Sequence, residues 1–478
     1  MSITQPPAEN EKNAGEASGV RFDRGTLVIE GIRGQNASET FPGTNLTYDK
    51  RAGVLRCDAL YFNTVNQILR DVEPGWSTDA ARWQALSWPK EDLHTLRSDQ
   101  NEAVKSWLPD KRGIIVMPTG TGKTEVGLAI MHLLGVSTLI ISPVRDLMYQ
   151  WHQRILDRLG YDAGIIGDNT FNKRPVSVTT YDSASIHMQS FGDEFGLLIF
   201  DECHHLPGPV RSDAARMSIG PYRLGLTATL ERSDGRENLL EGLIGPVVYR
   251  YPISRARGKV LAEYDINRIP VYLAAEEQAR YDACTRAIRN YMTARRREDP
   301  DFTGIELRKE VGNNAESRRI VQAIRVKESI EDRAQEKLRV LEDLFRLHNG
   351  SRILVFTGSN AMAREVSARF LIPCLLHHSR KKERKEILDG FRSGSYPAIV
   401  ANQVLDEGVD IPEAKIAIVL GGFASAKQAK QRLGRILRKT GEARAVLYEV
   451  VCAETREVQR SRQRRRSDAY QGTRHIHL

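Results

Sequence analysis

The sequence predicts an α/β protein built on two doubly wound parallel sheets. Short apolar runs typical of buried strands alternate with helical patterns from about residue 93 to 252, and the alternation resumes from about 351 to 453. Between these regions, from about 271 to 347, the chain is dense in charge and its apolar residues recur at helical spacing. These patterns indicate two sheet-based lobes that are separated along the chain by a helical insertion.

The residues before the first lobe predict a disordered tail and a small folded domain. Residues 1–19 are rich in Glu, Asn, Pro and Ala and have almost no large apolar side chains. Strands are expected at Thr26–Glu30, Leu46–Tyr48 and Val54–Cys57, and a helix from Tyr61 to Val72. The expected domains are therefore a tail (1–19), a small α/β domain (20–90), lobe 1 (91–255), the helical insertion (270–348), lobe 2 (349–455) and a basic tail (456–478).

The segment Met117–Thr124 indicates a phosphate-binding loop. It lies between the apolar run Gly113–Val116 and the helical pattern Glu125–Ile130. Glycines in such a loop let backbone N–H groups turn toward an anion, at the positive end of the following helix. The lysine can reach the outer phosphates of ATP, and the last threonine can hold Mg²⁺. The predicted nucleotide-binding residues are Gly120, Thr121, Gly122, Lys123 and Thr124.

Two adjacent carboxylates end another expected strand. Asp201 and Glu202 directly follow the apolar run Leu197–Phe200. In a chain with a phosphate-binding loop, Asp201 can hold Mg²⁺, directly or through water, and Glu202 can orient and deprotonate the attacking water. Cys203 and two histidines come next, but no fourth ligand is evident and we do not expect a metal site there.

The second lobe supplies cations for the same reaction. Gln431, Arg435 and Arg438 are spaced i, i+4 and i+7, so they share one face of a helix. Arginines brought by a second domain are typical of fingers that close on a γ-phosphate. A solvated basic helix is the alternative, and the preceding segment Asp406–Gly408 favours the finger interpretation. We expect these three residues and Glu202 to be catalytic.

The order of these motifs resembles a superfamily 2 helicase and, more narrowly, the XPB family. The general resemblance rests on Met117–Thr124 (with Met117 in place of the glycine of the strict P-loop), Asp201–His205, Thr227–Thr229, Asn402–Pro412 and Gln431–Arg438. The narrower resemblance rests on Leu96–Gln100, Leu226–Thr229, Arg232–Arg236, Gln403–Pro412, Gln431–Arg438 and Val446–Glu449. XPB proteins are known from DNA repair and transcription in eukaryotes and archaea, and bacteria also have them.

This resemblance implies two RecA-like lobes with ATP between them and 3′-to-5′ movement on DNA. It implies that Gln100 helps to bind adenine and that Asp410 responds to the nucleotide from lobe 2. Single-stranded DNA would cross both lobes, held by its backbone, and a forked duplex would be unwound. The small domain lies where the family has a domain proposed to sense damaged DNA, and the helical insertion lies where it has a thumb.

One element departs from the family pattern. XPB proteins carry Arg-Glu-Asp soon after Thr-Ala-Thr, and this element is thought to help separate strands. Here Arg232, Ser233 and Asp234 are the counterpart, so a hydroxyl that is neutral at pH 7 replaces a carboxylate. The replacement either loosens the coupling of ATP hydrolysis to strand separation or is neutral drift in a loop.

Composition is compatible with a polyanionic partner. Lys plus Arg number 70 against 61 Asp plus Glu, a formal charge of +9. The clusters Arg295–Arg297 and Arg456–Arg466 can contact phosphates or form solvated surface. The five scattered cysteines show neither zinc spacing nor a disulfide framework, which fits a cytoplasmic protein. No apolar run is long enough to span a membrane, so no membrane partner is expected.

Two other functions remain open at this stage. The chain could be a duplex-DNA translocase or remodeller that separates strands weakly, which the replacement at Ser233 favours. It could also be a scaffold that ATP switches and that recruits a nuclease. The intact Glu202 and finger arginines favour a working ATPase. No nuclease motif is evident, so any cutting would need a nuclease partner.

Overall fold

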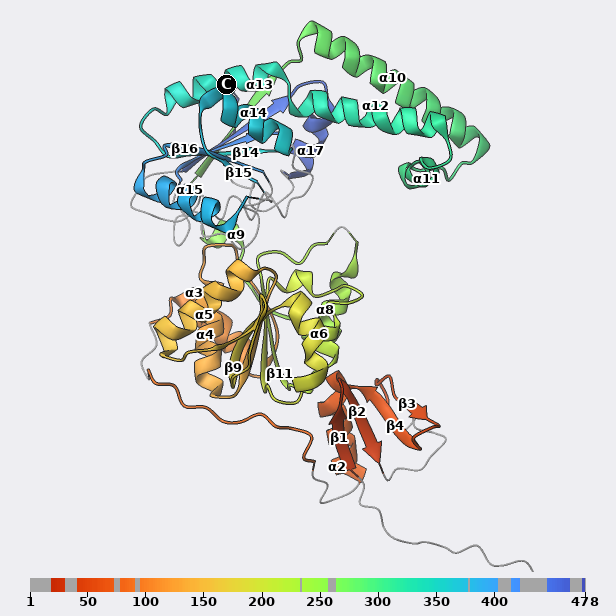
Figure 1. Ribbon diagram of the computed structural model, residues 1–478, viewed down its shortest axis with the longest axis vertical. Coiled ribbons are helices and arrows are strands. Elements are labelled where there is room, and N and C mark those ends of the chain that lie inside the picture. Colours follow the sequence, from red (N-terminus) through yellow and green to blue (C-terminus); the bar gives the residue numbers. More distant parts are fainter. Residues whose placement is uncertain are drawn as a thin grey trace, which may run out of the picture. The chain divides into compact units, whose positions relative to one another are not determined.

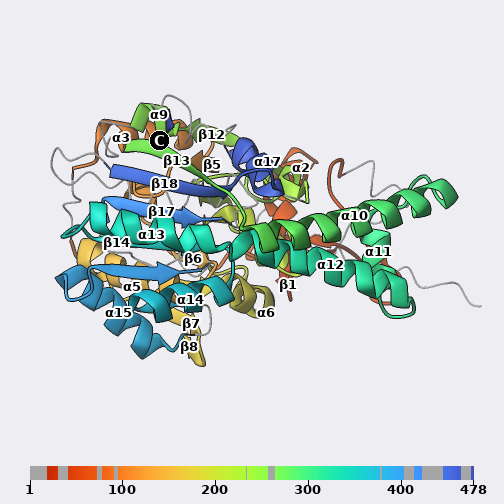
Figure 2. The same cartoon turned by 90° about the horizontal axis from the view of Figure 1, so that it is seen from above.

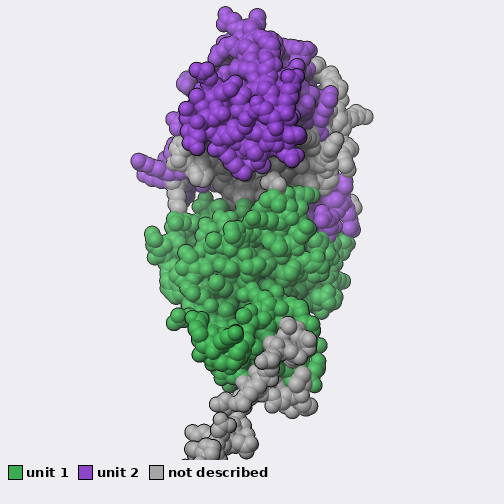
Figure 3. All heavy atoms as spheres, turned by 90° about the vertical axis from the view of Figure 1, so that its right-hand side faces the viewer, with its two compact units in different colours: residues 1–115, 124–249 green, residues 116–123, 250–478 purple. Residues whose placement is uncertain are grey.

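The computed structural model describes residues 19–30, 41–72, 78–90, 95–232, 234–256, 264–376, 379–402, 414–421, 445–464 and 475–477. The chain divides into two compact units (Figure 3). Unit 1 comprises Met1–Ile115 and Thr124–Tyr249, and unit 2 comprises Val116–Lys123 and Arg250–Leu478.

A four-stranded antiparallel sheet with one helix forms the N-terminal domain (Figure 1). The sheet has the order β1-β2-β4-β3. Its elements are β1 (Gly19–Asp23), β2 (Thr26–Glu30), β3 (Thr47–Asp49), β4 (Val54–Asp58) and α2 (Phe62–Val72). Val65 and Leu69 of α2 are buried in one apolar cluster with Leu27 and Leu55 of the sheet. The strands and the helix expected from the sequence are therefore confirmed.

Lobe 1 is an eight-stranded sheet with the order β12-β5-β11-β10-β6-β9-β7-β8. Its strands are β5 (Arg112–Val116), β6 (Thr138–Ser142), β7 (Gly164–Gly167), β8 (Thr170–Asn172), β9 (Val176–Thr180), β10 (Leu197–Asp201), β11 (Tyr222–Thr227) and β12 (Val247–Arg250). Its helices are α3 (Ser98–Trp107), α4 (Lys123–Leu134), α5 (Arg145–Leu159), α6 (Tyr181–Phe191), α7 (Asp213–Arg216) and α8 (Leu239–Leu243). The central strands β6 and β10 are buried throughout, as expected for a parallel sheet covered on both faces.

A glycine lets α4 lie close to α5 in lobe 1. A Cβ atom on Gly127 of α4 would lie 2.7 Å from Cη2 of Trp151, which is buried in α5. We therefore expect Gly127→Ala to lower the free energy of unfolding by about 1–3 kcal/mol, because the added methyl overpacks this contact. Thermal melting should show the decrease. Gly242→Ala in α8 is the control, since its Cβ would meet nothing within 4 Å. Equal melting temperatures for the two variants would contradict the prediction.

Lobe 2 is a seven-stranded sheet with the order β15-β16-β14-β17-β18-β13-β19, and its adjacent strands run parallel. Its strands are β13 (Tyr264–Val271), β14 (Ile353–Thr357), β15 (Cys374–Leu375), β16 (Ala398–Ala401), β17 (Ile416–Leu420), β18 (Ala445–Cys452) and β19 (His475–His477). Its helices include α14 (Asn360–Phe370) and α15 (Lys381–Ser393), and α9 (Ile253–Ala256) precedes it. The sequence patterns do not predict β13, which pairs with β18 from Tyr264↔Ala445 to Val271↔Cys452.

The helical insertion consists of two long antiparallel helices with a short one at their tip. α10 (Ala275–Glu298) and α12 (Ala315–Asp332) lie side by side, with α11 (Gly304–Glu310) between them in sequence (Figure 2). This part has its own apolar cluster, which includes Tyr291 and Phe302. The next helix, α13 (Gln335–Leu347), differs because its Leu338, Leu341 and Leu344 belong to the core of lobe 2.

A buried ion pair fixes the last described helix, α17 (Arg456–Arg464), onto lobe 2. Nζ of Lys337 on α13 lies 2.7 Å from Oε1 of Glu457, and both side chains are almost fully buried. The other oxygen of Glu457 accepts a hydrogen bond from the backbone N–H of Cys452 at 2.9 Å. Ser461 donates to Glu449 of β18 at 2.7 Å. Part of the expected basic tail is therefore a packed helix.

The predicted fold class is confirmed: two parallel-sheet lobes, a small N-terminal α/β domain, and a helical insertion between the lobes in sequence. All five cysteines are free thiols. In the described part of the chain, no helix combines the length and the apolar character that crossing a membrane requires.

Candidate nucleotide site

The phosphate-binding loop leaves β5 and enters α4, as the sequence predicts. Gly120 and Gly122 have φ values of +85° and +81°, a region that favours glycine. The Thr121 hydroxyl donates to the carbonyl of Pro118 at 2.7 Å, which closes the turn. Lys123 begins α4, and its ammonium group donates to the carbonyl of Met117 at 3.3 Å. The charge of Lys123 therefore lies against the loop, at the positive end of the helix.

Asp201, the last residue of β10, is held by two hydrogen bonds. Its Oδ2 accepts from the indole N–H of Trp151 at 2.8 Å, and its Oδ1 accepts from the N–H of Glu202 at 3.0 Å. Its backbone carbonyl accepts from the Tyr181 hydroxyl at 3.0 Å. Burial raises the pKa of Tyr181 well above its usual value, so this hydroxyl stays protonated as a donor. These contacts define the orientation of the Asp201 carboxylate.

Glu202 lies next to the end of β11. Its backbone has φ +47°, in the left-handed region that is unfavourable for a residue with a side chain. Its Oε2 is 3.4 Å from the Thr227 hydroxyl and 3.5 Å from Nδ1 of His204. The same hydroxyl lies 2.9 Å from Nδ1 of His204 and donates to the carbonyl of Thr229 at 2.7 Å. The acidic pair and the Thr-Ala-Thr segment are therefore in direct contact.

The segment after Thr-Ala-Thr contacts the backbone two residues beyond the acidic pair. The Arg232 guanidinium donates to the carbonyl of His204, and it pairs with Asp234 through hydrogen bonds of 2.8 and 2.7 Å. The hydrogen bonds from Arg232 hold the pKa of Asp234 well below its usual value, so Asp234 is ionised at neutral pH. Ser233 lies outside the described residues.

Sheet order brings the predicted site residues of lobe 1 toward one region. β11 lies between β5, which leads into the phosphate-binding loop, and β10, which ends at Asp201. β10 and β11 are parallel, so Asp201 and Thr227 are at the same edge of the sheet. This is the edge at which doubly wound sheets bind ligands.

Known protein families match the two regions of the chain that contain these motifs. The family model "Type III restriction enzyme, res subunit" matches residues 93–232, and "Helicase conserved C-terminal domain" matches residues 336–440. A protein of Sulfurisphaera tokodaii named "DNA 3'-5' translocase XPB2" is 43% identical over 375 residues, which cover 78% of this chain and 85% of that protein. The chain belongs to the XPB family of superfamily 2 helicases. Another family member, "DNA 3'-5' helicase XPB" of Mycobacterium tuberculosis, is 29% identical over 81% of this chain and 69% of its own length.

Solved structures show that this XPB-family chain has the RecA-like helicase fold. S. cerevisiae Dbp5, solved with RNA and ADP BeF3, superposes with a TM-score of 0.54 at 14% identity, covering 80% of this chain and 89% of Dbp5. The Hef helicase domain of Pyrococcus furiosus gives 0.51 at 17% identity, covering 76% and 97%. At these identities the likeness concerns the fold alone.

Gln100, predicted to contact adenine, is a capping residue at the start of α3. Its Oε1 accepts a hydrogen bond from the backbone N–H of Arg97 at 3.0 Å, and Gln100 is buried. Arg97 also pairs with Asp99 at 3.0 Å. The cap fixes the side chain of Gln100 at the first turn of the helix. The other predicted residues of this XPB-family site, Asp410, Gln431, Arg435 and Arg438, lie outside the described residues.

Sequence patterns do not identify two residues that contact the acidic pair. Trp151 is separated from Asp201 by 50 positions, and only its place on an amphipathic helix that precedes the acidic pair marks it. His204 follows the acidic pair after Cys203, but the spacing gives no sign that its ring contacts Thr227. The first contact depends on the packing of α5 against β10, and the second depends on the pairing of β10 with β11.

Proposed function

We propose that this chain is a DNA-dependent ATPase that moves 3′ to 5′ along DNA and couples ATP hydrolysis to duplex unwinding in DNA repair. The observation that carries this proposal is the 43% identity to a protein named a DNA 3'-5' translocase, over 85% of that protein's length. The contact of Glu202 with the Thr-Ala-Thr segment supports this proposal. ATP hydrolysis can drive movement along DNA only if the nucleotide site is coupled to the nucleic-acid site, and this contact would be part of that coupling.

ATP use follows from the family, and we propose which residues carry it. Lys123 would neutralise the outer phosphates, and Glu202 would orient and deprotonate the attacking water. Arg435 and Arg438, with Gln431, would stabilise the charge of the transition state from lobe 2. Gln100 would contact adenine and Asp410 would respond to the nucleotide.

The proposed Mg²⁺ ligands are Thr124 and Asp201. A hydroxyl and a carboxylate are the hard oxygen donors that this ion prefers, and Asp201 is held by hydrogen bonds on both of its oxygens. The ion would help to neutralise phosphate charge. Trp151 would act as a positioning residue, since its N–H fixes the rotamer of the carboxylate.

Replacing Trp151 with phenylalanine should therefore weaken Mg²⁺ binding rather than remove the site. The variant keeps most of the side-chain volume but has no N–H to orient Asp201. We expect half-maximal ATPase at a Mg²⁺ concentration about ten- to a hundredfold higher, the usual cost of removing a hydrogen bond to a metal ligand. A titration of ATPase rate with MgCl₂ measures this.

The matched control is Trp107→Phe. Trp107 is also buried, and its indole N–H donates to the carbonyl of Arg223 at 3.1 Å instead of to a carboxylate. This variant should be less stable than the wild type without a shift in the Mg²⁺ titration. Equal shifts in both variants would show that Trp151 acts only through packing.

Arg232 and Asp234 form the described part of the proposed strand-separating element. Arg232 contacts the backbone of His204, and the ring of His204 lies beside Glu202. A structural change on ATP hydrolysis could therefore pass from Glu202 through His204 to this segment. The alternative, a duplex-DNA translocase with weak unwinding, is favoured by the hydroxyl of Ser233 in place of a carboxylate.

The test measures ATPase with single-stranded DNA, duplex DNA and RNA, beside strand displacement on a forked duplex. The proposal expects stimulation by DNA and displacement of the strand. Stimulation by DNA without displacement would favour the translocase, and absence of stimulation by every nucleic acid would contradict both functions.

The proposal also extends to the cellular context. The five free cysteines support a cytoplasmic location. Any DNA cutting would require a nuclease partner, which co-purification from the native cell would reveal. An ATP-switched scaffold would bind such a partner without continuous ATP turnover. A variant that no longer hydrolyses ATP but still supports DNA cutting by the partner would therefore favour the scaffold function.

A further inference from the structure

His205 packs against the histidine that contacts Glu202. It ends the short 3₁₀ helix η2 (Cys203–His205), which follows Glu202 directly. The centre of its ring lies 4.3 Å from the centre of the His204 ring, and the two ring planes are inclined by 42°. His204 is almost fully buried, and its Nδ1 contacts both Glu202 and the Thr227 hydroxyl. The His205 ring therefore restricts how the His204 ring can turn.

The same ring lies close to the support of the other acidic residue. Its centre is 6.4 Å from the centre of the Tyr181 ring, within the range at which aromatic rings attract one another. The Tyr181 hydroxyl donates to the backbone carbonyl of Asp201. His205 is thus adjacent to two side chains, one that contacts Asp201 and one that contacts Glu202. A displacement of His205 would therefore move supports of both acidic residues.

A surface ion pair of lobe 1 also contacts His205. Nη1 of Arg211 lies 3.5 Å from Nδ1 of His205, and Nε of Arg211 donates to Oδ1 of Asp182 at 2.9 Å. Asp182 follows Tyr181 at the start of α6, and Arg211 comes from the loop after η2. A guanidinium group has donors only, so the Nδ1 that it approaches is the acceptor of this contact. Contacts therefore connect Asp182 with His204 through Arg211 and His205.

The ion pair is too exposed to contribute much to folding. The side chains of Arg211 and Asp182 are 36% and 71% exposed. Ion pairs exposed to this extent contribute little to the free energy of unfolding. The contact of Arg211 with His205 is therefore better explained by the position that it gives to the imidazole ring than by the stability of lobe 1.

We propose that His205 is a positioning residue for ATP hydrolysis and that Arg211 keeps it in place. The inference rests on the proposed role of Glu202. With His205 fixed, His204 stays against Thr227 and Glu202 and keeps the carboxylate in the orientation that hydrolysis needs. Misplacing a catalytic group by about 1 Å can cost about a hundredfold in rate, so a loss transmitted through His204 should lower kcat roughly tenfold. ATP binding should not change, because Glu202 acts on the attacking water.

The main test is His205→Phe in the full chain. Phenylalanine keeps an aromatic ring of similar size beside His204 and Tyr181, but it has no nitrogen to accept from Arg211. Steady-state ATPase kinetics should show a kcat about tenfold lower, with unchanged KM and unchanged binding of a labelled ATP. If His205 acted only through packing, this variant would have the wild-type kcat, and that result would overturn the proposal.

Arg211→Ala removes the same contact through its other partner. It should lower kcat to a similar extent, and its melting temperature should stay near that of the wild type because the ion pair is exposed. Arg211→Lys keeps a cationic donor and should recover part of the rate. Combining Arg211→Ala with His205→Phe should lower kcat no further, since both act through one contact. A decrease of about a hundredfold in the combined variant would show independent effects and overturn the proposal.

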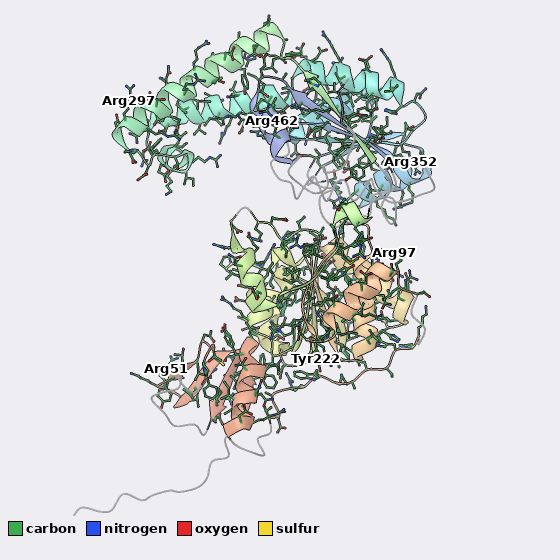
Figure 4. The ribbon with its side chains drawn as sticks, turned by 180° about the vertical axis from the view of Figure 1, so that it is seen from behind. Arg51, Arg97, Tyr222, Arg297, Arg352 and Arg462 are labelled. Atoms are coloured by element: carbon green, nitrogen blue, oxygen red, sulfur yellow. The ribbon has the colours of Figure 1, made fainter. Side chains whose placement is uncertain are left out.

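Two substitutions on the same lobe are the matched controls. His187→Phe changes a half-buried histidine of α6 whose ring centre lies 5.1 Å from that of the Phe171 ring. Arg174→Ala removes an arginine whose ion pair is similarly exposed, at 39% and 58%. Arg174 precedes β9, at the edge of the sheet where Tyr222 begins β11 (Figure 4) and opposite the acidic pair. Neither control should change kcat, and decreases equal to those of His205→Phe would overturn the proposal.

The outcomes also separate this inference from the proposed function. A wild-type chain that hydrolyses no ATP with any nucleic acid would overturn the proposed function, and the positioning role with it. Near-normal turnover by Glu202→Gln would overturn both the role of Glu202 and that of His205. Wild-type turnover that His205→Phe and Arg211→Ala leave unchanged would overturn only the positioning role.

Discussion

Replacing Glu202 with glutamine should abolish ATP turnover while ATP still binds. Glutamine has the same length and can keep a contact with the Thr227 hydroxyl, which lies 3.4 Å from the Glu202 carboxylate. It cannot accept a proton from the attacking water, and removal of a general base costs about a hundred- to ten-thousandfold in rate. Single-turnover phosphate release measures the chemical step, and fluorescence of a labelled ATP measures binding.

The control for this variant is Glu241→Gln on α8. Glu241 is exposed on the same lobe, so its replacement removes a carboxylate without touching the acidic pair. It should turn over ATP at the wild-type rate. Near-normal turnover by Glu202→Gln would show that another group activates the water.

Lys123→Ala should fail at both binding and turnover. Its ammonium group lies against the loop at the start of α4, and we propose that it neutralises the outer phosphates in the ground state and in the transition state. Cations that act on the transferred phosphoryl group contribute about a thousandfold or more to turnover. We expect a decrease of this size together with weaker ATP binding, measured by the same two assays.

Lys105→Ala on α3 is the charge-matched control, because Lys105 is exposed. The melting temperature of Lys123→Ala should stay near that of the wild type, since Lys123 contacts the loop rather than an apolar core. A Lys123→Ala protein that hydrolyses ATP normally would contradict the assignment of the loop. Glu202→Gln should retain ATP binding, whereas Lys123→Ala should lose it. This difference distinguishes activation of water by Glu202 from neutralisation of phosphate charge by Lys123.

The elements that form the nucleotide site could be predicted because each has a local signal. An apolar run, two glycines and a helical pattern follow one another around the phosphate-binding loop, and β5 and α4 lie where these patterns indicate. Asp201 ends a strand whose residues are all apolar before it. Each of these signals is contained in a short stretch of neighbouring residues. β5, α4 and β10 lie where the signals predict them.

Contacts between distant segments could not be predicted in the same way. The hydrogen bond from Trp151 to Asp201 depends on which helix covers β10, and the pattern of either segment does not contain that information. The pattern at the end of the chain predicts a basic tail, and it does not show that Glu457 within this tail is buried against Lys337. Arg456 lines a hollow with residues of α10 and α12 that lie more than a hundred positions earlier.

The pairing of β13 has a consequence for biosynthesis. Tyr264 pairs with Ala445, so 445 − 264 = 181 positions separate the two partners. The other described neighbour of β13 in the sheet, β19, comes still later. At about 5–20 residues per second, the ribosome needs roughly 9–36 s between the two strands. For that time β13 has an open hydrogen-bonding edge, which makes an incomplete chain prone to aggregate. Chains that terminate before residue 445 should therefore accumulate as insoluble or chaperone-bound fragments.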